Sequence, residues 1–250
     1  MDTAEYQAMA RVEETHPWFV NRRRLVRGLV RRYAHHLRSP RVLDAGCGTG
    51  VNLADYESFG ATVGIEFDPH AAILCAARGH HRVVVGSLCR LPFGDARFDL
   101  VISTDVIEHI DDDAAALIEL RRVLAAGGRM VITTPAYSWA YSSHDRFLHH
   151  VRRYDTVRLR DTIERARLQV VHWSRYNALL ALPLVAARRW RDRRARGNPN
   201  GSDVGRPLPR FMAPILNTIW RGEAFLAQRI NLRVGLTHVV VLKGRDDSNG

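Results

Sequence analysis

Residues 42–50, with the sequence VLDAGCGTG, join an apolar run to a turn that has a glycine at every second position. Glycines allow positive φ angles and leave no side chain between the backbone and a ligand. A second run, residues 62–65, ends on the carboxylate of Glu66. This layout is typical of a nucleoside-cofactor pocket in a doubly wound α/β domain. We therefore predict that Glu66 accepts hydrogen bonds from both ribose hydroxyls.

The glycine spacing and one preceding acid discriminate between cofactors. The pattern is Gly46-x-Gly48-x-Gly50, whereas a helix N-terminus that receives a pyrophosphate follows G-x-G-x-x-G. Asp44 precedes the turn, and its negative charge would repel a diphosphate but suits a ligand with an ammonium and a sulfonium group. These residues favour S-adenosylmethionine over a nicotinamide dinucleotide.

Charge is spread unevenly along the 250 residues, whose net charge is +11. Residues 42–150 carry 8 basic and 14 acidic side chains, whereas residues 151–250 carry 20 basic and 8 acidic ones. Basic flanks around an acidic core indicate an anionic partner, and the alternatives are a substrate phosphate or carboxylate, a membrane surface or RNA.

The cysteines and the hydropathy of the sequence indicate the cellular compartment of the protein. The three cysteines, Cys47, Cys75 and Cys89, are an odd number without metal-ligand spacing, so we expect reduced thiols and no metal site. The N-terminus does not resemble a signal peptide, and no apolar run approaches the roughly 20 residues needed to span a bilayer. These features predict a cytoplasmic protein, with peripheral membrane contact left open.

The order of apolar runs predicts an α/β fold with a doubly wound, seven-stranded, mostly parallel sheet. Residues 1–40 are expected to form an N-terminal helical cap, interrupted at Pro17. The cofactor-binding core is expected over residues 41–176 and 234–245, and a helical insertion over residues 177–233. The expected strands are residues 41–45, 61–66, 82–86, 98–104, 129–134, 168–175 and 236–242.

The helical insertion contains an apolar stretch, residues 178–187, followed by an arginine cluster at 188–196 and a Gly/Pro/Asn/Ser linker at 197–209. A further amphipathic helix is expected from residue 212 to residue 230. An apolar helix followed by arginines can lie on an anionic membrane. The alternatives are a cap over the substrate or a contact with a partner, including a homodimer.

The chain resembles the class I S-adenosylmethionine-dependent methyltransferases, and within them the small-molecule, ubiquinone-biosynthesis-like group. Residues 42–50 resemble the first motif of the family, and residues 63–66 resemble its ribose-binding strand end. Later strand regions are matched by residues 91–101, 106–110 and 120–128. The resemblance implies a Rossmann-like methyltransferase fold and in-line transfer of a methyl group from S-adenosylmethionine to an acceptor.

The resemblance also implies a cofactor site at the strand ends. The family usually has an acid after the third strand for the adenine amino group. Here Ser87 and Leu88 stand there, so the Ser87 hydroxyl or the backbone near Leu88 is expected to serve. The expected cofactor-binding residues are Asp44, Gly46, Cys47, Gly48, Gly50, Glu66, Phe67, Ser87, Leu88, Thr104 and Asp105.

Three side chains are candidates for removing a proton from the acceptor. His109 follows the fourth expected strand, at the edge where open α/β sheets bind ligands, and an imidazole can accept a proton near neutral pH. Local packing in the turn is the alternative for His109. His149 and Tyr154 lie with His150 in a loop of about 20 residues, 135–154, and loops of this length are usually functional or disordered.

Other side chains are candidates for binding the acceptor. Arg152 and Arg153 can each bind a carboxylate or phosphate in a bidentate manner, unless they only cap the following helix. Trp18 is expected either to close over the pocket or to anchor the N-terminal helix. The predicted acceptor is therefore a small or lipid-linked anionic molecule.

Two other functions stay open from the sequence. The basic flanks fit an RNA methyltransferase, but residues 134–137 (TPAY) only superficially resemble the Asn/Asp-Pro-Pro-aromatic motif for base amines. No RNA-binding module is recognisable, so nucleic acid is not the expected partner. The other alternative is a catalytically silent cofactor-binding protein, against which the intact Asp44, glycine turn and Glu66 argue.

Overall fold

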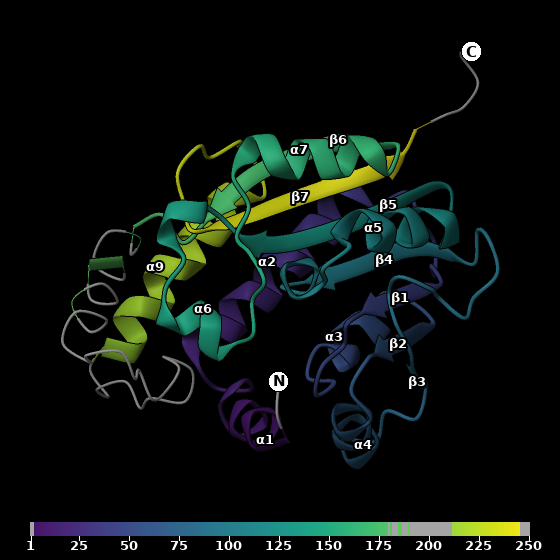
Figure 1. Cartoon of the computed structure of the whole chain (residues 1–250), viewed down its shortest axis with the longest axis horizontal. Coiled ribbons are helices and arrows are strands. Elements are labelled where there is room, and N and C mark those ends of the chain that lie inside the picture. The colour runs from purple at the N-terminus through teal and green to yellow at the C-terminus, as the bar shows by residue number, and fades with distance from the viewer. Residues whose placement is uncertain (1–2, 180, 182–184, 187–189, 191–211, 246–250) are drawn as a thin grey trace.

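The computed structural model describes residues 3–179, 181, 185–186, 190 and 212–245. Half of the expected apolar stretch 178–187, all of the arginine cluster 188–196 except residue 190, and the whole linker 197–209 lie outside the described residues. Figure 1 shows a twisted sheet with helices on both faces.

The sheet has the strand order β3-β2-β1-β4-β5-β7-β6. The strands are β1 (Val42–Ala45), β2 (Thr62–Glu66), β3 (Val83–Val85), β4 (Phe98–Thr104), β5 (Leu124–Pro135), β6 (Leu168–Tyr176) and β7 (Thr237–Gly244). Strands β1 to β5 pair in parallel, and β7 is antiparallel to both β5 and β6. The predicted doubly wound, mostly parallel sheet of seven strands is confirmed.

Helices cover both faces of the sheet. The α-helices are α1 (Thr3–Val12), α2 (Pro17–Tyr33), α3 (Leu53–Glu57), α4 (Pro69–Ala77), α5 (Asp113–Val123), α6 (Ser143–Phe147), α7 (Thr156–Arg165) and α9 (Met212–Ala227), and two short 3₁₀ helices are η1 (Ile107–His109) and η2 (Ser138–Ala140). Side chains of β1 alternate between the two layers. Leu43 belongs to the core beneath α5 and α7, and Val42 to the core beneath α2 and α9 (Figure 1).

The local signals for helix starts behave as expected. The break predicted at Pro17 separates α1 from α2, and the His16 imidazole accepts a hydrogen bond from the Trp18 amide at 3.2 Å. At α4, the Asp68 carboxylate accepts from the His70 amide at 2.8 Å, and Pro69 is the first helical residue. Both starts combine a side-chain cap with a proline whose missing N–H is not needed there.

Two boundaries differ from the sequence prediction. Strand β5 begins at Leu124, five residues earlier than expected, because Gly127 adopts a φ of +74° and Gly128 passes close to the Asp99 carbonyl. Residues 135–154 are not one irregular loop, since they contain η2 and α6. The Ser142 amide and hydroxyl both donate to the Asp145 carboxylate, which fixes the start of α6.

The topology brings the ends of β1 and β4 together. These strands are neighbours, while the chain leaves β1 toward β2 on one side and β4 toward β5 on the other. Ligands of open α/β sheets bind in the crevice at such a switch point. Among the described helices, none is both long and apolar enough to cross a bilayer.

Candidate functional site

The glycine turn after β1 has the backbone that its sequence predicts. Gly46 has a φ of +80° and Gly48 a φ of +57°. A Cβ at Gly46 would lie 2.5 Å from the Val106 side chain, so this position is closed to any other residue. A Cβ at Gly48 would meet the Met9 methyl at 3.9 Å and nothing closer. The Gly48 backbone is therefore open to close approach by a ligand.

Glu66, at the end of β2, is held by backbone donors from both sides. Its Oε2 accepts from the Gly48 amide at 2.8 Å, and its Oε1 accepts from the Phe67 and Asp68 amides at 2.9 and 3.1 Å. The Tyr6 hydroxyl also donates to Oε1, at 3.4 Å. The carboxylate is thus fixed in one orientation beside the glycine turn, in contact with Tyr6 of α1.

Asp44 is a buried carboxylate without a hydrogen-bond partner among the described residues, for either of its oxygens. Burial, and then the nearby charge of Glu66, raise its pKa to about 8. A buried carboxyl group of this kind is satisfied by a ligand that brings a positive charge or hydrogen-bond donors. The ammonium group of S-adenosylmethionine has both, so the residues at this position fit that cofactor.

An ion pair joins α2 to the end of β4. Arg22 donates to the Asp105 carboxylate, which also accepts from the Thr133 hydroxyl at 2.8 Å. Asp105 has a φ of +53°, an uncommon conformation for a non-glycine residue that often marks functional sites. Burial disfavours the charged guanidinium of Arg22, but its interaction with the Asp105 carboxylate outweighs this cost and raises the pKa of Arg22.

Helix α1 lies over this site and is tied down at its far end. Glu13 accepts hydrogen bonds from the Thr49 hydroxyl in the glycine turn and from Arg78 at the end of α4. Arg23 of α2 donates to the carbonyl of Glu13 at 2.7 Å. The two ends of α1 thus contact the two elements that form the cofactor cradle, through Tyr6 and Glu13.

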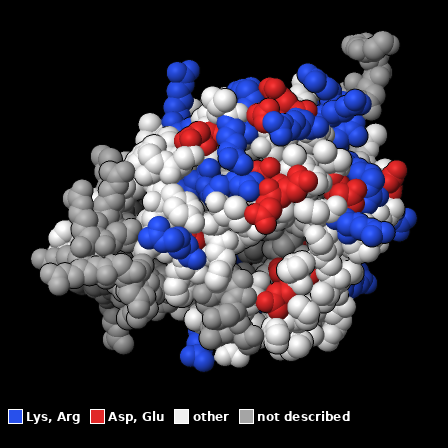
Figure 2. Space-filling view, viewed as in Figure 1, with Lys and Arg blue, Asp and Glu red and all other residues white. Residues whose placement is uncertain are grey.

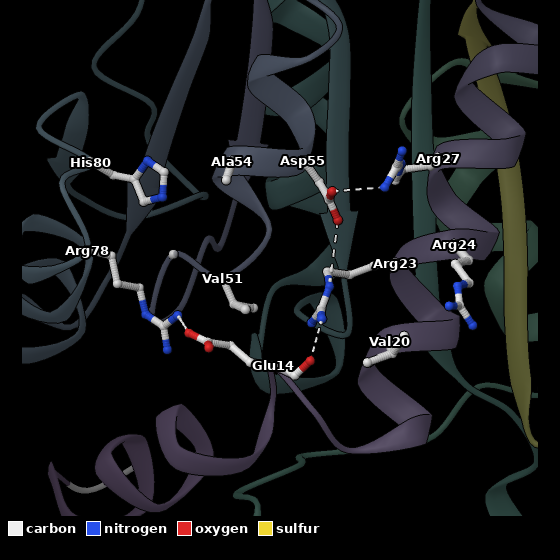
Figure 3. Close-up of a pocket in the computed structure, with 11 residues that line it drawn as sticks. Glu14, Val20, Arg23, Arg24, Arg27, Val51, Ala54, Asp55, Arg78 and His80 are labelled. Carbon is white, nitrogen blue, oxygen red and sulfur yellow. Dashed lines mark hydrogen bonds and ion pairs between the residues drawn. The ribbon is translucent and has the colours of Figure 1, made fainter. Parts of the chain in front are cut away.

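A cavity of about 620 Å³ lies between α2, α3 and the end of α4, as Figure 3 shows. Arg23 and Arg27 point from α2 to Asp55, and Arg78 points to Glu14 (Figure 3). Arg23, Arg27 and Arg78 are therefore paired with acids, whereas Arg24 donates to the side-chain oxygens of Asn21 and Asn217. The network clamps the end of α1 to the core.

The remaining predicted cofactor residues surround the same strand ends. Phe67 follows Glu66 and is 77 % exposed, so most of this residue is accessible. The Ser87 hydroxyl accepts from the Cys89 amide at 3.2 Å, while the Leu88 side chain lies in the core. Thr104 ends β4 beside Asp105. Gly50 has a φ of +83° and packs on Cys75, and the Cys47 sulfur lies 4.0 Å from that of Cys75.

A second cluster of ionisable groups follows β4. Ligand atoms of Glu108, His109 and His150 all lie within 4.8 Å of one another, which is a set that a metal ion could also use. Burial and the neighbouring His150 lower the pKa of His109 to about 4. His109 is therefore neutral near pH 7 and a weak base. Glu108 is buried, and burial raises its pKa well above the usual range.

His150 is oriented by a buried acid. Its Nδ1 lies 2.9 Å from the Asp145 Oδ1, and Asp145 is fully buried. Burial opposes ionisation of Asp145, but the hydrogen bond from His150 and the guanidinium of Arg153 outweigh it and lower its pKa. An ionised Asp145 holds a proton on Nδ1 of His150, which directs Nε2 of that imidazole to other partners.

The structure corrects the placement of Tyr154. This side chain is fully buried beneath α5, and its hydroxyl donates to the Asp113 carboxylate at 2.7 Å. Burial and the bond to Asp113 raise its pKa far above the usual value for a phenol. Tyr154 therefore lies in the core and does not reach the pocket. His149, with a φ of +56°, is exposed at the end of the turn that follows α6.

The two predicted anion-binding arginines are engaged within the protein. Arg152 lies 2.9 Å from the Asp113 carboxylate and donates to the Asp111 carbonyl. Arg153 is buried, and its Nε donates to Asp145 at 2.7 Å. These arginines point to two different acids, because neighbouring side chains on an extended backbone diverge. An anion could bind them only by replacing those acids.

Trp18 is part of the packing between α2 and α9. Its ring stacks on that of Tyr176 at 5.3 Å and meets the edge of Trp220 at 5.8 Å. Of the two roles expected for Trp18, the structure favours the anchor of the N-terminal helix. Among the described residues of the face in Figure 2, Lys and Arg side chains are intermingled with Asp and Glu and form no continuous basic band.

Sequence reasoning did not single out Tyr6, Glu13 or Asp145 as site residues, and placed no role on Arg22 by itself. Tyr6 and Glu13 reach the site only because α1 packs against α4, near the ends of β1 and β2, a contact that no local pattern encodes. Asp145 had a signal, since Ser142-x-x-Asp145 is a variant of the capping box.

The comparisons with known proteins concern the central part of the chain. Residues 43–132 match the family model described as a methyltransferase domain. A relative from Mycolicibacterium smegmatis, named a probable S-adenosylmethionine-dependent methyltransferase, is 33 % identical over 146 residues, which are 56 % of this chain and 56 % of the relative. A ubiquinone biosynthesis O-methyltransferase of a Bradyrhizobium species is 34 % identical over 105 residues, or 40 % of this chain and 41 % of that protein.

A similar fold occurs in a solved S-adenosylmethionine-dependent methyltransferase from Thermotoga maritima. The TM-score is 0.58 at 18 % identity, and the alignment covers 92 % of this chain and 93 % of that one. The chain spans about half the length of the curated relatives it matches. These matches confirm the predicted methyltransferase resemblance, the fold class and the family cofactor.

Proposed function

We propose that this chain, whose residues 43–132 are a methyltransferase domain of the class I S-adenosylmethionine-dependent type, transfers a methyl group to a small or lipid-linked, anionic acceptor. One observation carries the proposal. A buried, unpartnered Asp44 lies beside an open glycine turn, next to a Glu66 that backbone amides hold in place. This arrangement can bind one elongated ligand that places a positive charge at Asp44 and a ribose at Glu66.

The roles of the cofactor residues follow from their chemistry. Glu66 would accept the ribose hydroxyls, Asp44 would face the ammonium, and Arg22 would reach the methionine carboxylate only by exchanging Asp105 for it. When bound, S-adenosylmethionine supplies a methyl group that its sulfonium makes electrophilic. The protein then has to align acceptor, methyl and sulfur, and has to remove a proton if the acceptor carries one.

We propose that His150, rather than His109, removes this proton from the acceptor. His150 lies in a cluster with Glu108 and His109 after the end of β4, and its Nδ1 contacts Asp145, which leaves Nε2 for another partner. His109, with a pKa of about 4, is a poorer proton acceptor near neutral pH. An imidazole oriented by a carboxylate is a common general base. The acceptor group is accordingly a hydroxyl or an amine, which needs such a base.

Three features support the other parts of the proposal. The net charge of +11, with 20 basic residues after residue 150, favours an anionic acceptor. The relative named for ubiquinone biosynthesis methylates oxygen, which supports a hydroxyl group. The contacts of Tyr6 with Glu66 and of Glu13 with Thr49 support a role for residues 1–40 as a cap over the cofactor.

Glu66→Ala is expected to weaken binding of S-adenosylhomocysteine by roughly 1.5–3 kcal/mol, because charge-assisted hydrogen bonds to the ribose are lost. Isothermal titration calorimetry on the purified protein measures this affinity. Glu57→Ala is the matched control, since Glu57 is half-exposed and bonded to His80 at 3.3 Å. Equal affinity of Glu66→Ala and wild type would exclude the ribose assignment.

Cofactor affinity is expected to rise with pH between about pH 5 and 7, by up to about tenfold per unit. Asp44 has a pKa of about 8 in the ligand-free protein, so it is protonated in this range. An ammonium beside it favours the ionised form, and binding therefore releases a proton. The range stays below the titration of a free α-amino group, at about pH 7.7–8.0.

Calorimetry in buffers of different ionisation enthalpy counts the released proton directly. Asp44→Asn should bind more weakly and with little dependence on pH, whereas Asp95→Asn, an exposed acid paired with Arg122, should behave like wild type. An affinity of the wild type that does not change over this range would show that Asp44 does not ionise when the cofactor binds.

A further inference from the structure

An apolar stripe runs along α9 next to its buried face. The buried face packs against α2 and β6 and consists of Leu216, Trp220, Glu223, Ala224 and Ala227. Beside it on the helix, Ile215, Ile219 and Leu226 follow one another at spacings of four and seven residues, and Ile230 lies just after the end of α9. Such spacings align side chains along one side of a helix. Ile215, Leu226 and Ile230 are 45–57 % exposed, so this stripe is not part of the core.

The surface around this stripe is apolar and basic. Phe225 and Val234 are more than half exposed, and the Arg229 guanidinium lies 3.5 Å from the centre of the Phe225 ring. Arg221 and Arg233 are exposed as well. We call this set the α9 surface; its members are Ile215, Phe225, Leu226, Ile230, Val234, Arg221, Arg229 and Arg233.

Acidic side chains are absent from the α9 surface. Glu223 is the one acid in the sequence between residues 212 and 245. It is buried and accepts hydrogen bonds from the Ala178 and Leu179 amides at 2.9 and 2.6 Å. The three arginines of this surface therefore have no carboxylate in their own segment, and the surface as a whole is suited to a partner that is both apolar and negatively charged.

We propose that the α9 surface binds the face of an anionic phospholipid bilayer. The exposed apolar side chains would enter the boundary between headgroups and acyl chains, while arginines keep their charged ends among lipid phosphates. Charge complementarity selects this occupant over a second copy of the chain, because two such surfaces would bring like charges together. It also selects it over RNA, for which large aliphatic side chains offer no stacking platform.

Membrane binding goes beyond the proposed methyl transfer and does not depend on it. The arginines contribute through the surface potential, so binding should weaken as salt is raised. The apolar side chains contribute through burial, which salt does not screen. Both parts can be removed separately in the purified full chain, with no need for an acceptor or for cofactor turnover.

The test is co-sedimentation with vesicles of equal parts phosphatidylglycerol and phosphatidylcholine, compared with vesicles of phosphatidylcholine alone. The wild type is expected to bind the anionic vesicles and to bind the neutral ones at least tenfold more weakly. The triple variant Arg221→Gln, Arg229→Gln, Arg233→Gln should bind the anionic vesicles roughly a hundredfold more weakly than wild type. Each arginine near the surface contributes a factor of about ten or less. The double variant Phe225→Ser, Leu226→Ser should lose more than tenfold.

Matched controls use exposed residues elsewhere. Ile73→Ser on α4 and Val157→Ser on α7 remove exposed apolar side chains, and Arg165→Gln removes an exposed arginine paired with Asp161; all should bind as wild type does. Circular dichroism and cofactor binding report whether each variant folds. The proposal is overturned if the wild type does not bind anionic vesicles, if neutral vesicles bind equally, or if both α9 variants retain binding. It is also overturned if light scattering shows a dimer that the Phe225 and Leu226 changes dissociate.

Discussion

His150→Ala is expected to lower the turnover number for a hydroxyl or amine acceptor by roughly 10²–10⁴-fold, the usual loss for a general base. The imidazole is held by a buried, ionised Asp145 through a 2.9 Å contact, so its Nε2 is presented in one orientation. The Michaelis constant of the acceptor should change much less than turnover, because proton removal belongs to the transition state. Steady-state kinetics with an acceptor found by screening hydroxyl, amine and carboxylate compounds measures both quantities.

His109→Ala separates the two imidazoles. With a pKa of about 4, His109 contributes little as a base near pH 7, so its loss should cost far less turnover than the loss of His150. His70→Ala, on the exposed start of α4, serves as a control for histidine removal in general. Added imidazole should partly restore His150→Ala, which a purely structural defect would not allow. If His150→Ala turns over at the wild-type rate, or if the acceptor is a carboxylate that is already ionised, His150 is not the base.

Arg153→Ala is expected to lower the free energy of unfolding by about 3–5 kcal/mol, as is usual when one partner of a buried ion pair is removed. The guanidinium is 4 % exposed and donates to a fully buried Asp145 at 2.7 Å, so the variant leaves that carboxylate without its main counter-charge. Urea denaturation followed by circular dichroism measures the difference. Arg165→Ala is the control, because its pair with Asp161 is more than half exposed and should contribute less than about 1 kcal/mol.

The destabilisation should depend on pH in a defined direction. Asp145 has a lowered pKa in the folded protein, so its ionised pairing stabilises the fold above the unfolded-state pKa of about 4 and is lost as pH falls below that value. The gap between wild type and Arg153→Ala should therefore be largest near neutral pH and should shrink on acidification. If Arg153→Ala is as stable as wild type but has a raised Michaelis constant for the acceptor, Arg153 is instead an anion-binding residue.

Local patterns in the sequence predicted the parts of this protein that neighbouring residues determine. The strand, glycine turn and Glu66 follow from short-range spacing, and the start of α4 follows from Asp68 and Pro69. The doubly wound, mostly parallel sheet of seven strands followed from alternation of strands and helices, because handedness and short connections leave few topologies. The early start of β5 was missed because it depends on the positive φ of Gly127 and on the close approach of Gly128 to Asp99 in β4.

Side-chain partners across the fold were not predictable in the same way. The sequence placed Arg153 and Tyr154 in a loop over the pocket, but each is buried against an acid, Asp145 or Asp113, that lies 8 or 41 positions away in the chain. A run of basic residues does not indicate which of them will pair with a buried carboxylate in the folded protein. Tyr6 reaches Glu66 across 60 positions, which is a tertiary contact that no periodicity reveals.

The contact between Tyr6 and Glu66 bears on how often the enzyme can turn over. The phenol and a ribose hydroxyl would compete for the same carboxylate oxygen, and Glu13 ties the other end of α1 to Thr49 in the glycine turn. If Glu66 binds the ribose as proposed, the contacts that α1, a helix of ten residues, makes with the cofactor site must break and re-form each time the spent cofactor leaves and a fresh one binds. The pace of catalysis would then be set by the opening of that helix, and changes at the N-terminus would alter the rate without touching the chemistry.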